Sequence, residues 1–241
     1  CIRDRVRSGT KGVEFVAVNT DKQALNVSSA TYKIQIGEKL TGGMGAGSKP
    51  DIGQKSAEES KALISQVLEG TDMVFITAGM GGGTGTGASP VIAKLAKEMG
   101  MLTVGIVTSP LAVEGKIRYE QAFRGIEELR QNVDSLLIIN NENILEIYGR
   151  LALKQAFGKA DDILASAAKG IAEIITVESD LVNVDFADVQ TVMSDSGVAL
   201  MGSGRASGED RAMKVANMAL ESPLLNHNDI AGAKNILINI T

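Results

Sequence analysis

Short apolar, β-branched runs alternate with longer segments of helical period in the first part of the chain. The short runs predict strands at Val13–Val18, Tyr32–Ile36, Met73–Thr77, Leu102–Val107 and Ser135–Ile139. Apolar residues at three- and four-residue spacing predict helices at Ile52–Glu69, Thr86–Met99 and Lys116–Val133. This alternation is typical of one mostly parallel central sheet covered by helices, so the predicted fold class is α/β.

One long helix is predicted from Leu153 to Val177, where apolar residues keep helical spacing without a proline. At 1.5 Å per residue it would span roughly 36 Å, which is enough to cross a whole domain. A second α+β module is therefore expected to start beyond it. Its predicted elements are a helix at Asp185–Met193, a strand at Val198–Gly202, a helix at Asp210–Leu220 and a strand at Asn235–Ile240.

The composition indicates a folded, cytoplasmic chain. Its 241 residues are 44% hydrophobic, which is enough to bury a substantial core. The net charge of −5 comes from interspersed acids and bases, so no basic surface is expected for nucleic acid or anionic lipid. Cys1 is the single cysteine, and no signal-like leader or membrane-length apolar run is present. We therefore expect no nucleic-acid partner and no direct membrane insertion.

The single histidine, His227, lies in the polar run Asn226–Asp229 with no second histidine and no cysteine near it. A metal site built from protein side chains is therefore not predicted. His227 also has no nucleophile motif to serve, so catalysis by a serine–histidine or cysteine–histidine pair is not expected.

The segment Gly79–Gly87 follows a predicted strand and opens a predicted helix. Free backbone N–H groups and the positive end of the helix then meet at one place, which indicates an anion site. Glycines let the backbone approach a phosphate chain closely, and the hydroxyls of Thr84 and Thr86 can donate to its oxygens. A second glycine-rich turn, Thr41–Gly47, also follows a predicted strand, where ligands of open α/β sheets bind.

Glycines alone do not identify the class of phosphate ligand. A P-loop would continue with Gly-Lys-Ser/Thr, but Ala88 and Ser89 follow Gly87. A dinucleotide-binding turn can be read from Gly83, Gly85 and Ala88, but the next strand ends without an acidic residue for a ribose. A nicotinamide-dependent oxidoreductase therefore remains as the alternative interpretation.

Several separated motifs resemble the tubulin-like GTPases of the FtsZ family. The sequence GGGTGTG at Gly81–Gly87 resembles the signature of the tubulin family. Further segments that resemble FtsZ are Val18–Asp21 with Gln23–Leu25, Gly45–Gly47, Glu114–Lys116 with Arg118, Asn183–Asp188, Met201–Gly204 and Gly208–Arg211. The resemblance runs from about Gly9 to Thr241 and implies a tubulin-like fold. It implies a GTP-binding domain at residues 1–152, a central helix at 153–177 and a partial C-terminal domain at 178–241.

The resemblance also implies binding of GTP or GDP, with Mg²⁺ held through the nucleotide phosphates. The residues expected around the phosphates are Gly79, Gly81, Gly82, Gly83, Thr84, Gly85 and Thr86, with Gly45, Ala46 and Gly47 closing over the γ end. Asn19 and Asp21 belong to the same expected site, and Glu114 and Arg118 are expected at the sugar and phosphates. The residues expected to face guanine are Asn141, Phe157 and Asp161.

Asp185 and Asp188 are two carboxylates three positions apart at a predicted helix start. Taken alone, this spacing is equally compatible with N-capping. By resemblance to FtsZ, these acids and Asn183 act on the nucleotide of the neighbouring subunit. The long predicted helix separates them from the glycine loop by roughly 36 Å, so they would reach a nucleotide only in a head-to-tail neighbour.

The expected function is that of an assembling GTPase, whose filaments form the bacterial cell-division ring at mid-cell. The expected partners are further copies of the chain and division-ring adaptor proteins. A non-hydrolysing tubulin-like scaffold is a further alternative, against which the intact Asp185 and Asp188 argue. Lys49 and Asn140 differ from common family residues, and the apolar strand and glycine loop that open the family are not found in Cys1–Ser8. We therefore expect a chain shortened at both ends, with Cys1–Val6 foreign to it. GTP binding and hydrolysis are expected to be impaired in the chain as given.

Overall fold

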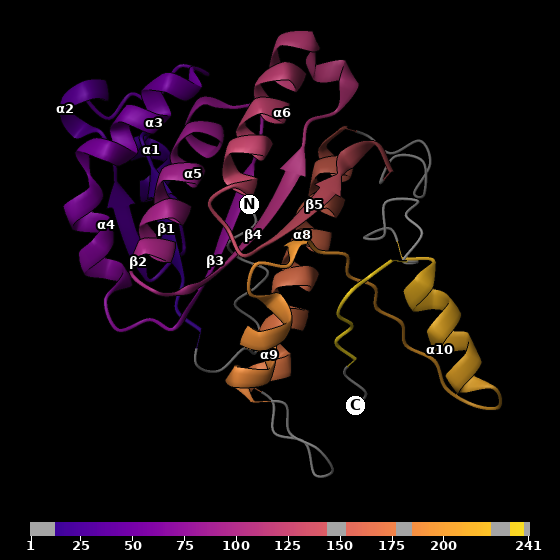
Figure 1. The fold of residues 1–241 in the computed structure, drawn as a ribbon. Coiled ribbons are helices and arrows are strands. Elements are labelled where there is room, and N and C mark those ends of the chain that lie inside the picture. Colours follow the sequence, from indigo (N-terminus) through magenta and orange to yellow (C-terminus); the bar gives the residue numbers. More distant parts are fainter. Residues whose placement is uncertain (1–12, 144–152, 177–184, 223–231, 239–241) are drawn as a thin grey trace.

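The computed structural model describes residues 13–143, 153–176, 185–222 and 232–238. In these ranges six strands form two parallel sheets. Figure 1 shows how the sheets lie among the helices. The smaller sheet pairs β1 (Val16–Asn19) with β2 (Tyr32–Gln35). The larger sheet has the order β3-β4-β5-β6, formed by Met73–Gly79, Leu102–Ser109, Ser135–Asn140 and Gly197–Val198. Every pairing is parallel, as expected for strands joined by helical crossovers.

Helices connect and cover these strands. In the first part of the chain they are α1 (Lys22–Asn26), α2 (Glu38–Thr41), α3 (Pro50–Glu59), α4 (Lys61–Leu68), α5 (Gly83–Glu98), the 3₁₀ turn η2 (Ala112–Glu114) and α6 (Lys116–Arg130). Beyond them follow α8 (Leu153–Thr176), α9 (Phe186–Met193) and α10 (Arg211–Leu220). The predicted long helix is thus present, with 24 residues and a length of about 36 Å.

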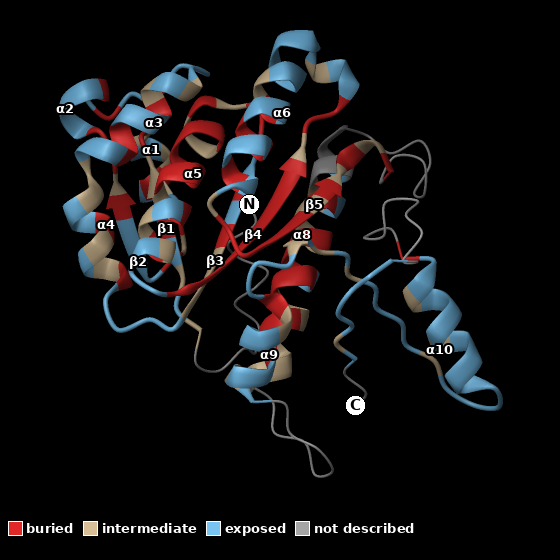
Figure 2. Cartoon of the chain, viewed as in Figure 1, coloured by how far each residue is buried: buried red, intermediate tan, exposed pale blue. Residues whose placement is uncertain are grey.

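The larger sheet is covered on both faces. On one face, Val104 and Ile106 of β4 pack with Leu164 of α8 and Val189 of α9 in one core cluster. On the other, neighbouring positions of β3, β4 and β5 pack with α5 and α6 in a second cluster that includes Val107 and Leu129. β4 is therefore buried almost throughout, as Figure 2 shows, which explains its continuous apolar sequence.

Helix α5 also joins the two sheets. A third cluster packs Ile34 and Ile36 at the smaller sheet with Ile64 of α4 and with Ala88 and Val91 of α5. The same helix therefore contributes to the cores of both sheets, because Ala93 of α5 belongs to the second cluster. In the described residues no strand pairing links the two sheets, so the prediction of one central sheet is wrong in this respect.

The boundaries of several elements differ from those predicted. The predicted helix Ile52–Glu69 is two helices, because Ser60 leaves helical geometry at φ −103° and ψ 12°. Its hydroxyl accepts a hydrogen bond from the Gly37 N–H at 3.1 Å. This bond holds the break next to the start of α2, whose N-cap is Gly37. β1 begins at Val16 rather than Val13, where its pairing with Tyr32 begins.

The second module is less regular than predicted. Only Gly197–Val198 forms a strand where Val198–Gly202 was predicted, because the ladder with β5 covers two positions. Residues 235–238 are irregular, so the strand predicted at Asn235–Ile240 is wrong there, and its last two residues lie outside the described ranges. Among the described helices, none combines the length and apolar character needed to cross a membrane.

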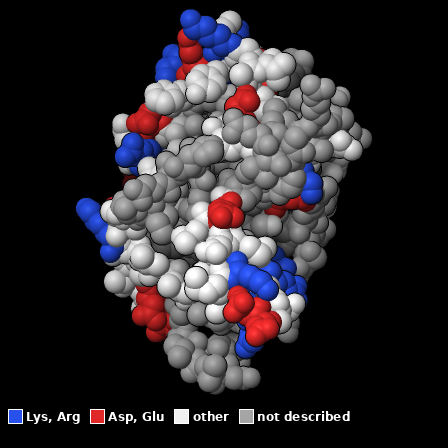
Figure 3. Space-filling view, turned by 90° about the vertical axis from the view of Figure 1, so that its right-hand side faces the viewer, with Lys and Arg blue, Asp and Glu red and all other residues white. Residues whose placement is uncertain are grey.

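Charged side chains are mixed over the surface. On the face seen in Figure 3, lysine and arginine alternate with aspartate and glutamate, and the described residues there form no large area of one sign. This distribution agrees with the interspersed charges of the sequence.

Candidate functional site

The glycine loop runs from the carboxyl end of β3 to the first turn of α5. Gly81 adopts φ +100°, and a Cβ there would lie 2.9 Å from the Cγ and carbonyl oxygen of Arg118. Two hydrogen bonds fix the loop: Met80 N–H donates to the Thr108 carbonyl at 2.9 Å, and Gly81 N–H donates to Thr86 Oγ1 at 2.8 Å. The loop therefore has one defined shape and requires glycine at position 81.

The first turn of α5 has no side-chain cap. Gly82 is the N-cap residue, and the helix continues for 16 residues. The backbone N–H groups of the first turn of a helix have no partner within the helix, and the helix dipole is positive there. This end of α5 therefore offers donors and positive potential to an anion.

Some glycines of the loop serve packing. A Cβ on Gly85 would lie 2.6 Å from the Gly79 carbonyl oxygen, and one on Gly87 would collide with the Pro50 carbonyl. A Cβ on Gly83 would lie 2.8 Å from both Ala46 Cβ and Lys49 N. These glycines bring α5 against β3, α3 and the second loop, a role that the sequence analysis did not separate from phosphate approach.

The second glycine-rich turn lies beside the first. Gly45 and Gly47 adopt φ +91° and +58°, and Ala46 is buried against Gly83. The Gly45 N–H donates to the Thr20 carbonyl at 3.3 Å, which attaches this turn to the end of β1. Three expected site residues, Gly45, Ala46 and Gly47, are thus brought next to the start of α5.

Asn19 and Asp21 hold the connection between β1 and α1. Asn19 Oδ1 accepts from the Asp21 N–H at 3.2 Å. Asp21 Oδ1 accepts from the N–H groups of Gln23 and Ala24 at 2.8 and 3.2 Å, so Asp21 is the N-cap of α1. Both side chains therefore shape the loop that faces the second glycine turn.

Thr20 is a site residue that the sequence analysis did not select. It is fully buried, and its hydroxyl lies 2.7 Å from the hydroxyl of Thr84 in the first turn of α5. Its place between Asn19 and Asp21, both expected in the site, was the available signal. The contact joins the smaller sheet to the glycine loop.

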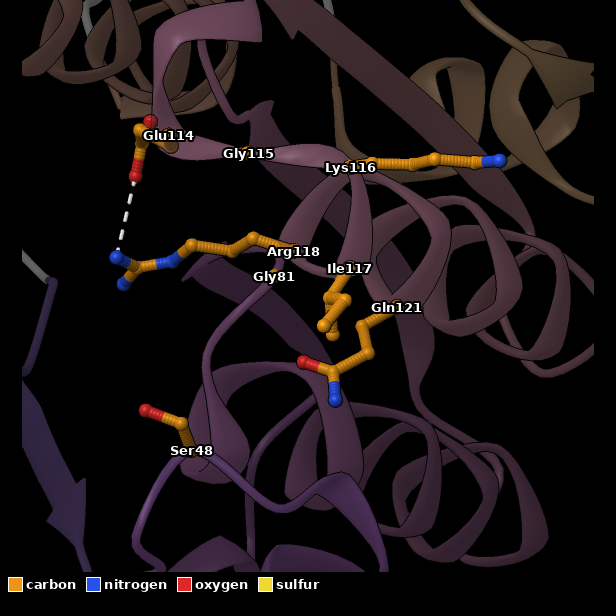
Figure 4. A pocket seen from close by; sticks show the side chains of 8 residues that line it. All are labelled: Ser48, Gly81, Glu114, Gly115, Lys116, Ile117, Arg118 and Gln121. Carbon is orange, nitrogen blue, oxygen red and sulfur yellow. Dashed lines mark ion pairs between the residues drawn. The ribbon is translucent and has the colours of Figure 1, made fainter.

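An open cavity of about 460 Å³ lies in front of the glycine loop. Its lining, drawn in Figure 4, comprises Ser48, Gly81, Glu114, Gly115, Lys116, Ile117, Arg118 and Gln121. Arg118 Nη1 lies 3.3 Å from Glu114 Oε2, and Glu114 Oε1 accepts from the Leu111 N–H at 2.8 Å. Glu114 is thereby fixed, whereas the half-exposed Arg118 extends across the space between η2 and Ser48.

The three residues expected to face guanine differ in burial, and the structure describes the side chains of only two of them. Asn141 directly follows β5 and is buried, and among the described residues its Oδ1 has no hydrogen-bond partner. Asp161 is half-buried on α8. The side chain of Phe157 lies outside the described residues. A buried acceptor without a partner is unusual, so Asn141 Oδ1 fits a donor that a ligand would bring.

Asp185 and Asp188 form a capping box at the start of α9. Asp185 Oδ1 accepts from the Asp188 N–H at 2.9 Å, and Asp188 Oδ2 accepts from the Asp185 N–H at 3.4 Å. Both residues are exposed. The capping interpretation is therefore realised, and the exposed carboxylates remain accessible to another molecule. Asn183 lies outside the described residues.

The acids of α9 and the glycine loop lie at different ends of the larger sheet. The C-terminal end of α9 leads to Gly197, which pairs with Ser135 at the amino end of β5. The glycine loop instead follows the carboxyl end of β3, as Figure 1 shows. In the described ranges, no group of three or more His, Cys, Asp or Glu side chains is arranged to hold a metal ion.

The fold and the glycine loop define a class: a parallel α/β protein with an anion-binding helix end at the carboxyl edge of its sheet. Comparison with known proteins makes this specific. Residues 5–149 match the GTPase domain of the Tubulin/FtsZ family, and residues 197–241 match the C-terminal domain of the FtsZ family. The chain belongs to the tubulin/FtsZ family, which confirms the family and the fold class predicted from the motifs.

Solved structures agree with this assignment. The chain is similar to an empty FtsZ dimer from M. jannaschii, with 48% identity, a TM-score of 0.88 and coverage of 93% of this chain and 65% of that one. An FtsZ mutant from M. jannaschii gives 47% identity, a TM-score of 0.89 and coverage of 93% and 68%. CetZ2 from Haloferax volcanii, at 23% identity and a TM-score of 0.73 over 86% and 64%, shares the fold. This chain thus spans about two thirds of the length of these relatives.

Proposed function

We propose that the protein binds GTP and GDP, hydrolyses GTP and assembles head to tail into filaments of the cell-division ring. The observation that carries this proposal is the uncapped start of α5 beside two glycine turns, with Arg118 across an open cavity. Positive helix potential, free N–H donors and a guanidinium are the groups that recognise a chain of phosphates. Neither comparison supports a nicotinamide-dependent oxidoreductase.

In this proposal, the phosphates lie on the glycine loop, with direct backbone approach at Gly81 and Gly82. A Cβ on Gly82 would meet open space, which leaves room for a ligand at that position. Thr84 and Thr86 shape the start of α5, and Gly45–Gly47 close the site from the second turn. Mg²⁺ would be held through the phosphates. It would offset their negative charge there.

The ribose lies near Glu114 and Arg118, and guanine near Asn141, Phe157 and Asp161. A carboxylate accepts the two N–H donors that guanine presents, and it would face an acceptor in adenine. The partnerless Oδ1 of Asn141 supports a polar ligand at the end of β5.

Hydrolysis takes place between subunits. Asp185 and Asp188, with Asn183, position and polarise the water that attacks the γ-phosphate of the neighbour. Phosphoryl transfer depends mainly on positioning and on electrostatic stabilisation, and exposed carboxylates at a helix start can provide both to a docked neighbour. Self-association is supported by relatives: one solved FtsZ is a dimer, and CetZ2 with bound GTPγS is a protofilament.

We propose three segments: a GTP-binding domain at residues 1–152, a central helix at 153–177 that adds Phe157 and Asp161 to the guanine site, and a partial C-terminal domain at 178–241 that carries the acids for the neighbour. The protein works in the cytoplasm at the mid-cell division site, where adaptor proteins join it to the ring. These partners are expected from family membership.

Isothermal titration of the protein with GTP, ATP and NAD tests the nucleotide assignment. We expect GTP to bind about five- to 150-fold more tightly than ATP, because a mismatched base leaves buried polar groups unpaired at a cost of about 1–3 kcal/mol. Equal affinities for GTP and ATP would contradict the guanine assignment, and tight NAD binding would restore the oxidoreductase alternative.

A further inference from the structure

A three-way ion pair lies far from the glycine loop, at the other end of α5. Lys97, in the last turn of α5, places its Nζ 3.0 Å from Asp134 Oδ1 and 2.9 Å from Asp195 Oδ1. Asp134 directly precedes β5, and Asp195 lies in the turn between α9 and β6. One ammonium group thus joins three elements that are distant in sequence.

Asp134 is the rigid member of this ion pair. Its side chain is only 10% exposed, and Oδ2 accepts from the Thr103 N–H of β4 at 2.9 Å. Its backbone N–H donates to the Thr103 carbonyl at 2.8 Å, and its carbonyl accepts from the Gly197 N–H of β6 at 3.0 Å. Lys97 is therefore bound to a residue that the larger sheet holds from both sides.

Asp195 is the member that belongs to the second module. It adopts the left-handed φ of +48°, which is uncommon for residues other than glycine and best tolerated by asparagine and aspartate. Its side chain is 84% exposed, so water alone could solvate the carboxylate, yet the carboxylate turns toward Lys97. The hydrogen bond to Lys97 lowers the pKa of Asp195, and the hydrogen bond to Asp195 raises the pKa of Lys97, so both groups are charged around neutral pH.

We propose that Lys97 is a positioning residue that couples the glycine-loop helix to α9 and so places Asp185 and Asp188 for the neighbouring subunit. This inference rests on the proposed function. α5 begins at the glycine loop and carries Lys97 in its last turn, and α9 begins directly after its N-cap Asp185 and ends at Met193, two positions before Asp195. The ion pair therefore links the phosphate site of a subunit with the acids that the same subunit presents to the next nucleotide.

The same helix supplies a contrast. Lys94 pairs with Glu98 at 3.9 Å along α5, and both side chains are about 60% exposed. Such a pair within one helix contributes little, and in the described part of the chain it connects α5 to no other element. Lys97 differs because its partners belong to the larger sheet and to the second module, so its loss would release the end of α9 as well as remove a charge.

The test compares Lys97→Met, Lys97→Arg, Asp195→Asn and the control Lys94→Met in the protein. Hydrogen exchange of the α9 amides is measured without nucleotide, and kcat and KM for GTP hydrolysis are measured at fixed protein concentration. Asparagine keeps the left-handed turn at position 195 and removes only the charge. We expect Lys97→Met and Asp195→Asn to speed exchange in α9 about two- to fivefold and to lower kcat by a similar factor, with KM unchanged.

Lys97→Arg should keep the exchange rate in α9 and kcat close to those of the unmodified protein, and Lys94→Met should change neither. Unchanged exchange in α9 in both Lys97→Met and Asp195→Asn would overturn the coupling, whether or not GTP is hydrolysed. Faster exchange with unchanged kcat would overturn the positioning role. Absence of hydrolysis in the unmodified protein would count against the proposed function, and exchange would still decide whether the coupling exists. If Lys97→Met does not fold, the exposed Asp195→Asn decides alone.

Discussion

The hydroxyl groups of Thr20 and Thr84 lie 2.7 Å apart, although 64 positions separate the two residues in sequence. Thr20 follows β1 of the smaller sheet, and Thr84 belongs to the first turn of α5 beside the larger sheet. This hydrogen bond is thus one of the few polar contacts that fix the glycine loop relative to the β1 side of the site.

Thr20→Val should therefore weaken both the fold and the site. Valine keeps the shape of threonine but leaves the partly buried Thr84 hydroxyl without this partner. We expect a loss of about 1–2 kcal/mol in unfolding free energy, seen as a fall in Tm of about 2–8 °C. Thr20→Ser retains the hydroxyl and is the control. Equal melting of the valine and serine variants would show that the hydrogen bond does not stabilise the site.

Gly87→Ala and Gly82→Ala should separate packing from ligand binding. A Cβ on Gly87 would collide with the Pro50 carbonyl and lie 2.7 Å from Gln54 N, so we expect a loss of about 3 kcal/mol in urea unfolding. A Cβ on Gly82 meets nothing within 4 Å, so stability should change by less than about 1 kcal/mol.

Gly82→Ala should instead lower GTP affinity by at least about tenfold in calorimetry, because the methyl group occupies the space in which a phosphate would approach the loop. If Gly82→Ala binds GTP as the unmodified protein does, the phosphates do not lie where we propose.

Asp185→Asn and Asp188→Asn should stop hydrolysis without loosening α9. An asparagine carbonyl can still accept the capping hydrogen bond, whereas alanine would cost about 0.5–2 kcal/mol. We expect GTP affinity to stay unchanged and kcat to fall by at least about 100-fold in a phosphate-release assay.

Mixing Asp185→Asn with Gly82→Ala should partly restore turnover, because each variant supplies the part that the other lacks. Turnover that is independent of protein concentration, with no recovery on mixing, would exclude a site shared between subunits.

The ion pair of Lys97 and Asp195 predicts a pH dependence of stability. The folded pKa of Asp195 is lowered, mainly by its hydrogen bond to Lys97, so its contribution is present above the unfolded value of about 3.9 and is lost as pH falls through the folded pKa. The folded pKa of Lys97 is raised, mainly by its hydrogen bond to Asp195, so its contribution is present below about 10.4 and is lost as pH rises through the folded pKa.

The difference in urea midpoint between the unmodified protein and Asp195→Asn should therefore be constant from about pH 5 to 9 and shrink toward pH 2–3. It should also shrink in 1 M salt, because the Asp195 side chain is 84% exposed and salt screens exposed charges. A difference that persists at low pH would assign the effect to the turn geometry at Asp195 and not to its charge.

Local pattern was sufficient for the main elements of the fold. The strands β3, β4 and β5 were predicted at their first residues, because each apolar run follows the short turn that ends the preceding helix. The break at Ser60 was not predicted, because it is fixed by a hydrogen bond from Gly37, 23 positions away. Strand pairing in the second module depends on similar distant contacts, so the sequence pattern overestimated β6 and the strand near residue 235.

For the site, motifs predicted which segments meet but not what each residue does. From the sequence we predicted that all glycines of Gly79–Gly87 form one phosphate loop. In the structure, Gly85 and Gly87 make room for the backbone of β3 and α3. Thr20 and Lys97 were not selected, because their partners lie far away along the chain. Such roles follow from three-dimensional proximity, which residue spacing does not encode.

The two-position ladder between β5 and β6 has a mechanical consequence. β4 and β5 are paired at six positions, but β5 and β6 only at Ser135–Gly197 and Leu136–Val198. In a filament linked as we propose, tension enters each subunit at the α9 side and leaves at the glycine loop, and the part of it that strand pairing carries passes through this short ladder. The β6 end would therefore yield before the rest of the sheet, and a pulled or bent filament would extend there first while the nucleotide pocket stays intact.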